Sequence, residues 1–148
     1  MAAEIAPEDV TYGEYGEVAE SREAARQLML QVVEDRKVAE DNIRAAYAFL
    51  ETAGAPRIGS MGCCFGGGWS LNTAQLFPDA LDASVIYYGQ VTDDEEKLRP
   101  VSAPILGLFG AADKGIPVES VRSFEAALNR HTLGTAGKFV DEVLWRAN

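Results

Sequence analysis

Histidine is almost absent from this chain, which contains one, His131, among 148 residues. Cysteine is also scarce, because the only two, Cys63 and Cys64, are neighbours in the sequence. So few residues of these types, without the spacing of metal ligands, give no indication of a metal site. Adjacent cysteines are also poor candidates for a structural disulfide, so we expect a reducing, cytoplasmic setting.

Long apolar runs and an excess of basic charge are missing as well. No run approaches the ~20 residues of a membrane-spanning helix, and the first residues lack the regions of a signal peptide. The formal net charge of -10 argues against a surface that binds nucleic acid. We therefore predict neither a nucleic-acid nor a membrane partner, and no motif indicates a cofactor.

The chain has the composition of an ordinary globular protein. Its apolar residues make up 47% of the sequence, and its length suits one domain, which we expect to cover residues 1–148. Two helices are predicted near the start, over residues 21–35 and 36–52. Apolar residues recur there at spacings of three and four, and Gly54 is a plausible stop for the second helix.

The pattern beyond Gly54 changes to short apolar runs separated by helix candidates such as residues 118–129. Continuous apolar runs suit strands that are buried on both faces of a parallel sheet. We predict an α/β fold with a parallel sheet of about four strands flanked by helices, and chemistry at the carboxyl ends of the strands. The predicted strands are residues 58–61, 83–88, 104–109 and 139–144.

The stretch Gly62-Cys63-Cys64-Phe65-Gly66-Gly67 is the most informative motif. It has the form of a nucleophile elbow, a strained strand-to-helix turn that presents one side chain to a site. On that spacing the nucleophile is Cys64, and the predicted strand before it and helix after it supply the expected context. The alternative is a glycine-rich turn that contains structural cysteines.

A second chemical group is expected beside Cys64. Asp113 follows the predicted strand 104–109, and the carboxyl ends of parallel strands meet at one edge of a sheet. The two side chains are therefore predicted to share a crevice. Tyr88, at the end of another strand, either lines that site or packs in the core. Cys63 is interpreted as a packing residue on the strand side of the turn.

These stretches resemble the dienelactone hydrolase (carboxymethylenebutenolidase) family of the α/β-hydrolase fold. The resemblance extends over roughly residues 20–130 and rests on the cysteine elbow, on Tyr87-Tyr88-Gly89, and on the run from Ala103 to Asp113. It implies hydrolysis of an ester or lactone by a Cys-His-Asp triad. In this chain it implies Cys64 as nucleophile, Asp113 as the acid that orients a histidine, and the Phe65 N–H as an oxyanion donor.

The resemblance also has gaps. The family's histidine follows the strand that corresponds to residues 139–145, but here Arg146-Ala147-Asn148 stands there. The family's first strands have no counterpart either, so the chain resembles a partial hydrolase, which predicts a fragmentary gene or a truncated sequence. His131, at the end of a predicted helix, is interpreted as a surface residue at the edge away from the site rather than as the base.

Three hypotheses follow. The first is a cysteine-dependent ester or lactone hydrolase that acts on a small molecule, with this chain incomplete for catalysis. The second is an inactive remnant of the fold that serves in binding or assembly. The third is a thiol redox protein that uses Cys63 and Cys64. Absent first strands would leave a free sheet edge, which predicts homo-oligomers through that edge.

Overall fold

The computed structural model describes residues 22–131 and 139–145. The chain divides into two compact units, Met1–Ala55 and Pro56–Asn148, which are described separately below. The first unit contains two helices, α1 (Arg22–Glu34) and α2 (Arg36–Thr52). Both helices were predicted, and the bounds of α2 agree with those expected from its apolar spacing.

The end of α2 shows why the helix stops where it does. Gly54 has φ +77°, a left-handed conformation that glycine adopts without steric cost. Its N–H donates to the carbonyl of Glu51 (2.9 Å), and the Ala55 N–H donates to the carbonyl of Leu50 (3.0 Å). These two bonds form a Schellman motif, which satisfies carbonyls that a helix end leaves without partners.

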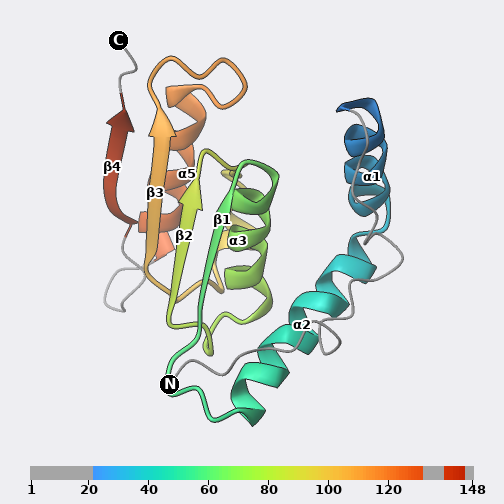
Figure 1. Ribbon diagram of the computed structural model, residues 1–148. Helices are drawn as coiled ribbons and strands as arrows, with labels where there is room; N and C mark the ends of the chain where they lie inside the picture. The colour runs from blue at the N-terminus through green and yellow to red at the C-terminus, as the bar shows by residue number, and fades with distance from the viewer. Residues whose placement is uncertain (1–21, 132–138, 146–148) are drawn as a thin grey trace. The chain divides into compact units, whose positions relative to one another are not determined.

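The second unit is built on a parallel sheet of four strands in the order β1-β2-β3-β4, so the predicted fold class is confirmed. In Figure 1 the strands point the same way and their carboxyl ends share one edge. The helices between them are α3 (Phe65–Leu76), α4 (Glu95–Leu98) and α5 (Val118–His131). The strands are β1 (Gly59–Cys63), β2 (Ala83–Tyr87), β3 (Ile105–Gly110) and β4 (Phe139–Trp145).

One face of this sheet forms the core of the unit. Strands in sequential order joined by right-handed crossovers place their helices on the same face. Accordingly, α3 contacts β1 and β2, α5 contacts β3 and β4, and side chains alternate between buried and partly exposed along β2 and β3. The largest fully buried apolar side chains among the described residues are Ile86, Ile105, Leu98, Val121, Phe124 and Leu128.

A serine cluster joins α3 to the sheet beneath it. The hydroxyl of Ser70 lies 2.9 Å from the hydroxyls of both Ser60 and Ser84, which come from β1 and β2. Ser60 and Ser84 also donate to the Ser70 carbonyl at 3.2 Å. Because buried polar groups are costly without partners, this cluster fixes the position of α3 over the first two strands.

Strand β1 lies at one end of the strand order among the described residues. Its residues Gly59, Met61 and Cys63 are exposed, with 74% of Met61 accessible. An edge strand of this kind presents backbone groups that can pair with another strand. The prediction of homo-oligomers through this edge stays a prediction.

Candidate active site

Cys64 connects β1 to α3 through a strained backbone conformation. Its φ of 54° and ψ of -118° lie in a region that residues with a side chain seldom occupy. Such strain costs on the order of 1–3 kcal/mol and persists where the surroundings enforce it. Here the Cys64 N–H donates to the Tyr87 carbonyl (2.9 Å), and the Cys64 carbonyl accepts from Gly67 (3.0 Å). The turn has the geometry that the elbow motif predicts.

Glycines allow the strand and helix to meet at this turn. A Cβ on Gly62 would lie 1.9 Å from the carbonyl oxygen of Gly66, so a side chain cannot fit there. A Cβ on Gly89 would lie 2.3 Å from the carbonyl carbon of Gly67. The start of α3 therefore lies directly against the backbone that follows β2, next to Tyr88.

Three predicted site residues follow three neighbouring strands at the carboxyl edge (Figure 1). Cys64 follows β1, Tyr88 follows β2 and Asp113 follows β3. Adjacent strands lie about 4.8 Å apart, so β1 and β3 are separated by roughly 10 Å. Cys64 and Asp113 thus follow strands that end at the same edge, with β2 between them, and the crevice that they are expected to share stays a prediction.

The interpretation of Cys63 as a packing residue is wrong, because Cys63 and Cys64 are both exposed free thiols. Cys63 ends the exposed side of β1 and lies beside Tyr88, which is 48% exposed and has φ 39°. The pKa of Tyr88 is raised, first by charge on Cys63, then by a hydrogen bond with Cys63, by partial desolvation and by charge on Cys64. Tyr88 therefore lines the thiol pair rather than the core.

The alternation of exposed and half-buried residues along β1 explains why Cys63 is exposed. Met61 and Cys63 are two residues apart, so they lie on the same side of the strand. Ser60, on the other side, contacts α3. Because α3 covers the side of β1 that carries Ser60, the side that carries Cys63 is left exposed.

Asp113 has a defined role in its own loop. Its Oδ1 atom accepts hydrogen bonds from the N–H groups of Gly115 (2.7 Å) and Ile116 (3.1 Å). This is the side-chain-to-backbone turn that aspartate often forms. The carboxylate is thereby fixed in orientation, which a residue that orients a base requires.

The N-terminus of α3 supplies backbone donors next to Cys64. Gly67 and Gly68 donate to the Cys64 carbonyl (3.0 and 3.4 Å), whereas the N–H of Phe65 precedes the first helical hydrogen bond. The positive end of the helix dipole also favours negative charge at this position. The turn thus places an exposed thiol beside the backbone N–H groups that begin α3.

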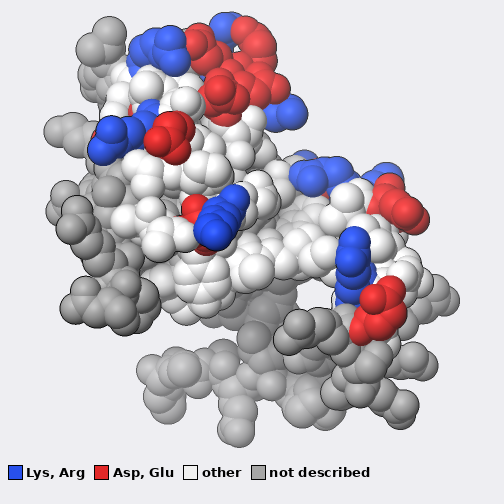
Figure 2. Space-filling model, turned by 90° about the horizontal axis from the view of Figure 1, so that it is seen from above, with Lys and Arg blue, Asp and Glu red and all other residues white. Residues whose placement is uncertain are grey.

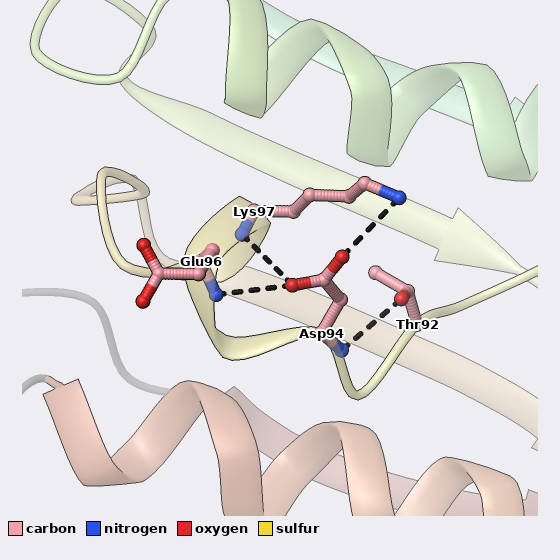
Figure 3. A network of polar contacts seen from close by, with 4 residues as sticks. All are labelled: Thr92, Asp94, Glu96 and Lys97. Carbon is pink, nitrogen blue, oxygen red and sulfur yellow. Dashed lines mark hydrogen bonds and ion pairs between the residues drawn. The ribbon is translucent and has the colours of Figure 1, made fainter.

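The segment between Tyr88 and α4 is held at its far end by a helix cap (Figure 3). Asp94 accepts from the N–H groups of Glu96 (3.1 Å) and Lys97 (3.4 Å), and its own N–H donates to the Thr92 hydroxyl (3.2 Å). The Lys97 ammonium lies 3.3 Å from Asp94 Oδ2 and is the main cause of the lowered pKa of Asp94. The cap anchors the segment that carries Tyr88.

Seen from the carboxyl edge, the described surface carries acidic and basic side chains in small clusters separated by uncharged areas (Figure 2). Within the described ranges, no three His, Cys, Asp or Glu residues lie close enough to hold a metal ion. No helix in the same ranges is both long and apolar enough to cross a membrane.

His131 is the last residue of α5. The helix starts after the carboxyl end of β3 and runs back before β4 begins, so its end lies at the opposite edge from Cys64 (Figure 1). The backbone therefore agrees with the expected position of His131, away from the thiols.

The elbow and the loop of Asp113 lie within a stretch that matches a known family. The sequence profile of the dienelactone hydrolase family matches residues 5–135. The chain belongs to this family. The resemblance noted from the sequence is thereby confirmed, and it covers the elbow, Tyr88 and Asp113.

Named proteins match this chain at moderate identity. A Methylorubrum extorquens protein provisionally named a carboxymethylenebutenolidase is 33% identical over 95% of this chain and 50% of its own length. A Bradyrhizobium protein named as a probable 2-oxo-3-(5-oxofuran-2-ylidene)propanoate lactonase is 30% identical over 71% of this chain and 46% of its own. The chain thus spans about half the length of these dienelactone hydrolase relatives.

A solved structure supports the fold. The crystal structure of a Thermoplasma acidophilum protein described as a predicted CIB-like hydrolase aligns with a TM-score of 0.56 and 19% identity. The alignment covers 76% of this chain and 49% of that chain. At this identity the likeness concerns the fold alone, and it agrees with the α/β-hydrolase arrangement of the dienelactone hydrolase family.

Proposed function

We propose that the chain carries the nucleophile of an ester or lactone hydrolase, and that Cys64 is this nucleophile. The observation that carries the proposal is an exposed thiol on a strained strand-to-helix turn in a member of the dienelactone hydrolase family. Cysteine suits this role because the fraction ionised at neutral pH, although small, is a strong nucleophile.

Phe65 and Asp113 have supporting roles in this proposal. Attack on the carbonyl places negative charge on its oxygen, and the Phe65 N–H next to the thiol stabilises that charge. Asp113 orients a base, since its Oδ1 atom is fixed by two backbone N–H groups. Since β2 lies between β1 and β3, that base would sit above the carboxyl end of β2.

The substrate class follows from the relatives. The curated names of two similar proteins refer to a butenolide and to a furanylidene lactone. We propose a small-molecule ester or lactone for this chain as well. Both cysteines are exposed free thiols, which supports the proposal that the protein works in a reducing compartment such as the cytoplasm.

Hydrolysis of p-nitrophenyl acetate tests the proposal. The chain is compared with Cys64→Ala, which removes only the sulfur, and with Cys63→Ser as a matched control for the neighbouring thiol. We expect release of p-nitrophenol by the wild type and by Cys63→Ser, and background release by Cys64→Ala. Equal release by all three proteins would contradict a nucleophilic Cys64.

A second candidate function is a catalytically inactive module for binding or assembly. Among the described residues, His131 ends α5 at the edge away from Cys64, which favours this alternative. It predicts background release of p-nitrophenol by the wild type as well as by Cys64→Ala.

A further inference from the structure

Cys63 and Cys64 are two exposed thiols on consecutive residues. In a regular strand neighbouring side chains point to opposite faces, which would hold such a pair apart. The turn at Cys64 ends this alternation, because its φ of 54° takes the backbone out of the strand conformation. Both thiols therefore lie where β1 turns into α3, and neither is buried.

Tyr88 lies beside both sulfurs. The pKa of Tyr88 is raised first by charge on Cys63, then by a hydrogen bond with Cys63, by partial desolvation and by charge on Cys64. Because the effect of a charge falls with distance, one phenol interacts with both sulfurs only when both lie near it. The two thiols and the hydroxyl of Tyr88 thus form one exposed cluster, in which the neutral hydroxyl can donate to a negative sulfur.

The two thiols differ in their surroundings. Cys64 is the N-cap of α3, a helix of 12 residues whose positive dipole end favours a negative sulfur at that position. Thiolate character and exposure determine which cysteines are oxidised by peroxides, so Cys64 is the thiol expected to react first. Cys63 is exposed on the neighbouring residue, which is the place of a thiol that reacts with the oxidised form.

We propose that Cys63 and Cys64 form a reversible pair that is oxidised by hydroperoxides, with Cys63 as the resolving thiol. The Cys64 thiolate attacks one oxygen of hydrogen peroxide, the O–O bond breaks, hydroxide leaves, and Cys64 becomes a sulfenic acid. The Cys63 sulfur then attacks the Cys64 sulfur and the S–O bond breaks. The hydroxide that leaves combines with the thiol proton of Cys63 as water, and a disulfide remains. Two electrons pass from the two sulfurs to the peroxide.

This disulfide is reversible because it is strained. Consecutive Cα atoms are about 3.8 Å apart, whereas the Cα atoms of ordinary disulfides are about 4.4–6.8 Å apart. Strained and exposed disulfides are reduced more readily than structural ones. The activity goes beyond hydrolysis and needs no ester, but it removes the thiolate of Cys64 for as long as the pair is oxidised.

Thiol labelling with N-ethylmaleimide, followed by intact-mass measurement, tests the proposal. The reduced chain should carry one maleimide group on each cysteine. After treatment with equimolar hydrogen peroxide, we expect the wild type to accept no maleimide and to have lost the mass of two hydrogen atoms. Dithiothreitol should restore both labels, and a non-reducing gel should show a single chain.

Cys63→Ser is the matched control, because it keeps Cys64 and removes the resolving thiol. Its sulfenic acid should be trapped by dimedone, and further peroxide should convert it to a sulfinic acid that dithiothreitol does not reduce. Cys64→Ala keeps Cys63 and removes the thiol at the start of α3. It should lose its remaining label more slowly than the wild type loses both.

Several outcomes would overturn the proposal. These are a peroxide-treated wild type that keeps one or both labels, a loss of both labels that dithiothreitol does not reverse, and a disulfide-linked dimer on the gel. Equally fast oxidation of Cys64→Ala would also overturn the role given to Cys64. Hydrolysis by the reduced chain is measured separately with p-nitrophenyl acetate, so failure of this proposal is distinguishable from failure of the proposed function.

Discussion

The two glycines that flank the elbow differ in what they tolerate. A Cβ on Gly62 would lie 1.9, 2.3 and 2.8 Å from the oxygen and carbon of Gly66 and the nitrogen of Gly67. Ordinary carbon contacts are about 3.5–4.0 Å, so the helix start would have to move by more than about 1 Å. Extra atoms in a packed region destabilise a protein by about 1–3 kcal/mol. Because the Cβ of Gly62→Ala would clash with backbone atoms, we expect a loss of stability at or above the upper end of this range.

Gly66→Ala is the matched control. No atom lies within 4 Å of a Cβ at this position, and Gly66 is not among the glycines with positive φ. Alanine within a helix is favoured over glycine by about 0.5–1 kcal/mol. The free energies of unfolding of Gly62→Ala and Gly66→Ala should therefore differ by about 3–4 kcal/mol, with Gly62→Ala the less stable.

Urea unfolding followed by far-ultraviolet circular dichroism measures this difference. The midpoint of Gly62→Ala should fall well below that of the wild type, while the midpoint of Gly66→Ala stays equal or rises. Two variants of equal stability would refute the close approach of β1 and α3, and with it the geometry assigned to the elbow.

Three further results are expected. Asp113→Asn should keep the turn to Gly115, because the amide oxygen still accepts, yet slow the hydrolysis of p-nitrophenyl acetate because the charge is missing. An unchanged rate would contradict an orienting role. Tyr88 should ionise above the usual tyrosine range, and Cys63→Ser should lower the pKa of Tyr88. An absorbance titration measures this pKa, with Tyr88→Phe as the reference that lacks the Tyr88 signal. The Asp94 carboxyl should titrate below 3.8, as measured by carbon NMR. The stability that the cap contributes is therefore present above that pH and is lost as the pH falls through the lowered pKa of Asp94.

Much of the fold could be predicted from local patterns. Apolar spacing and Gly54 determined the bounds of α2, and continuous apolar runs identified the strands of the parallel sheet. The helix α4 was not predicted, because its four residues are too few to show a helical period. It depends instead on the cap formed by Asp94. The helix α3 already starts at Phe65, so it includes the later glycines of the motif, and Gly67 lies too close to Gly89 for a side chain to fit there.

The site was predictable where backbone geometry determines it. The glycine spacing identified the elbow at Cys64, and strand order explained why Asp113 shares its edge. The exposure of Cys63 could not be read from the motif, because it depends on which side of β1 the helix α3 covers. That choice follows from the serine contacts between Ser60 and Ser70, which form only in three dimensions.

The rate of acetylation of Cys64 in the folded chain, relative to the same thiol in the urea-unfolded chain, most directly tests whether the elbow is catalytic. An oxyanion donor contributes about 10²–10³-fold, so the folded chain should react faster by a factor of that order after correction for thiolate content. Equal rates in the two states would mean that Cys64 is merely an exposed thiol, and the proposed nucleophilic role of the turn would be wrong.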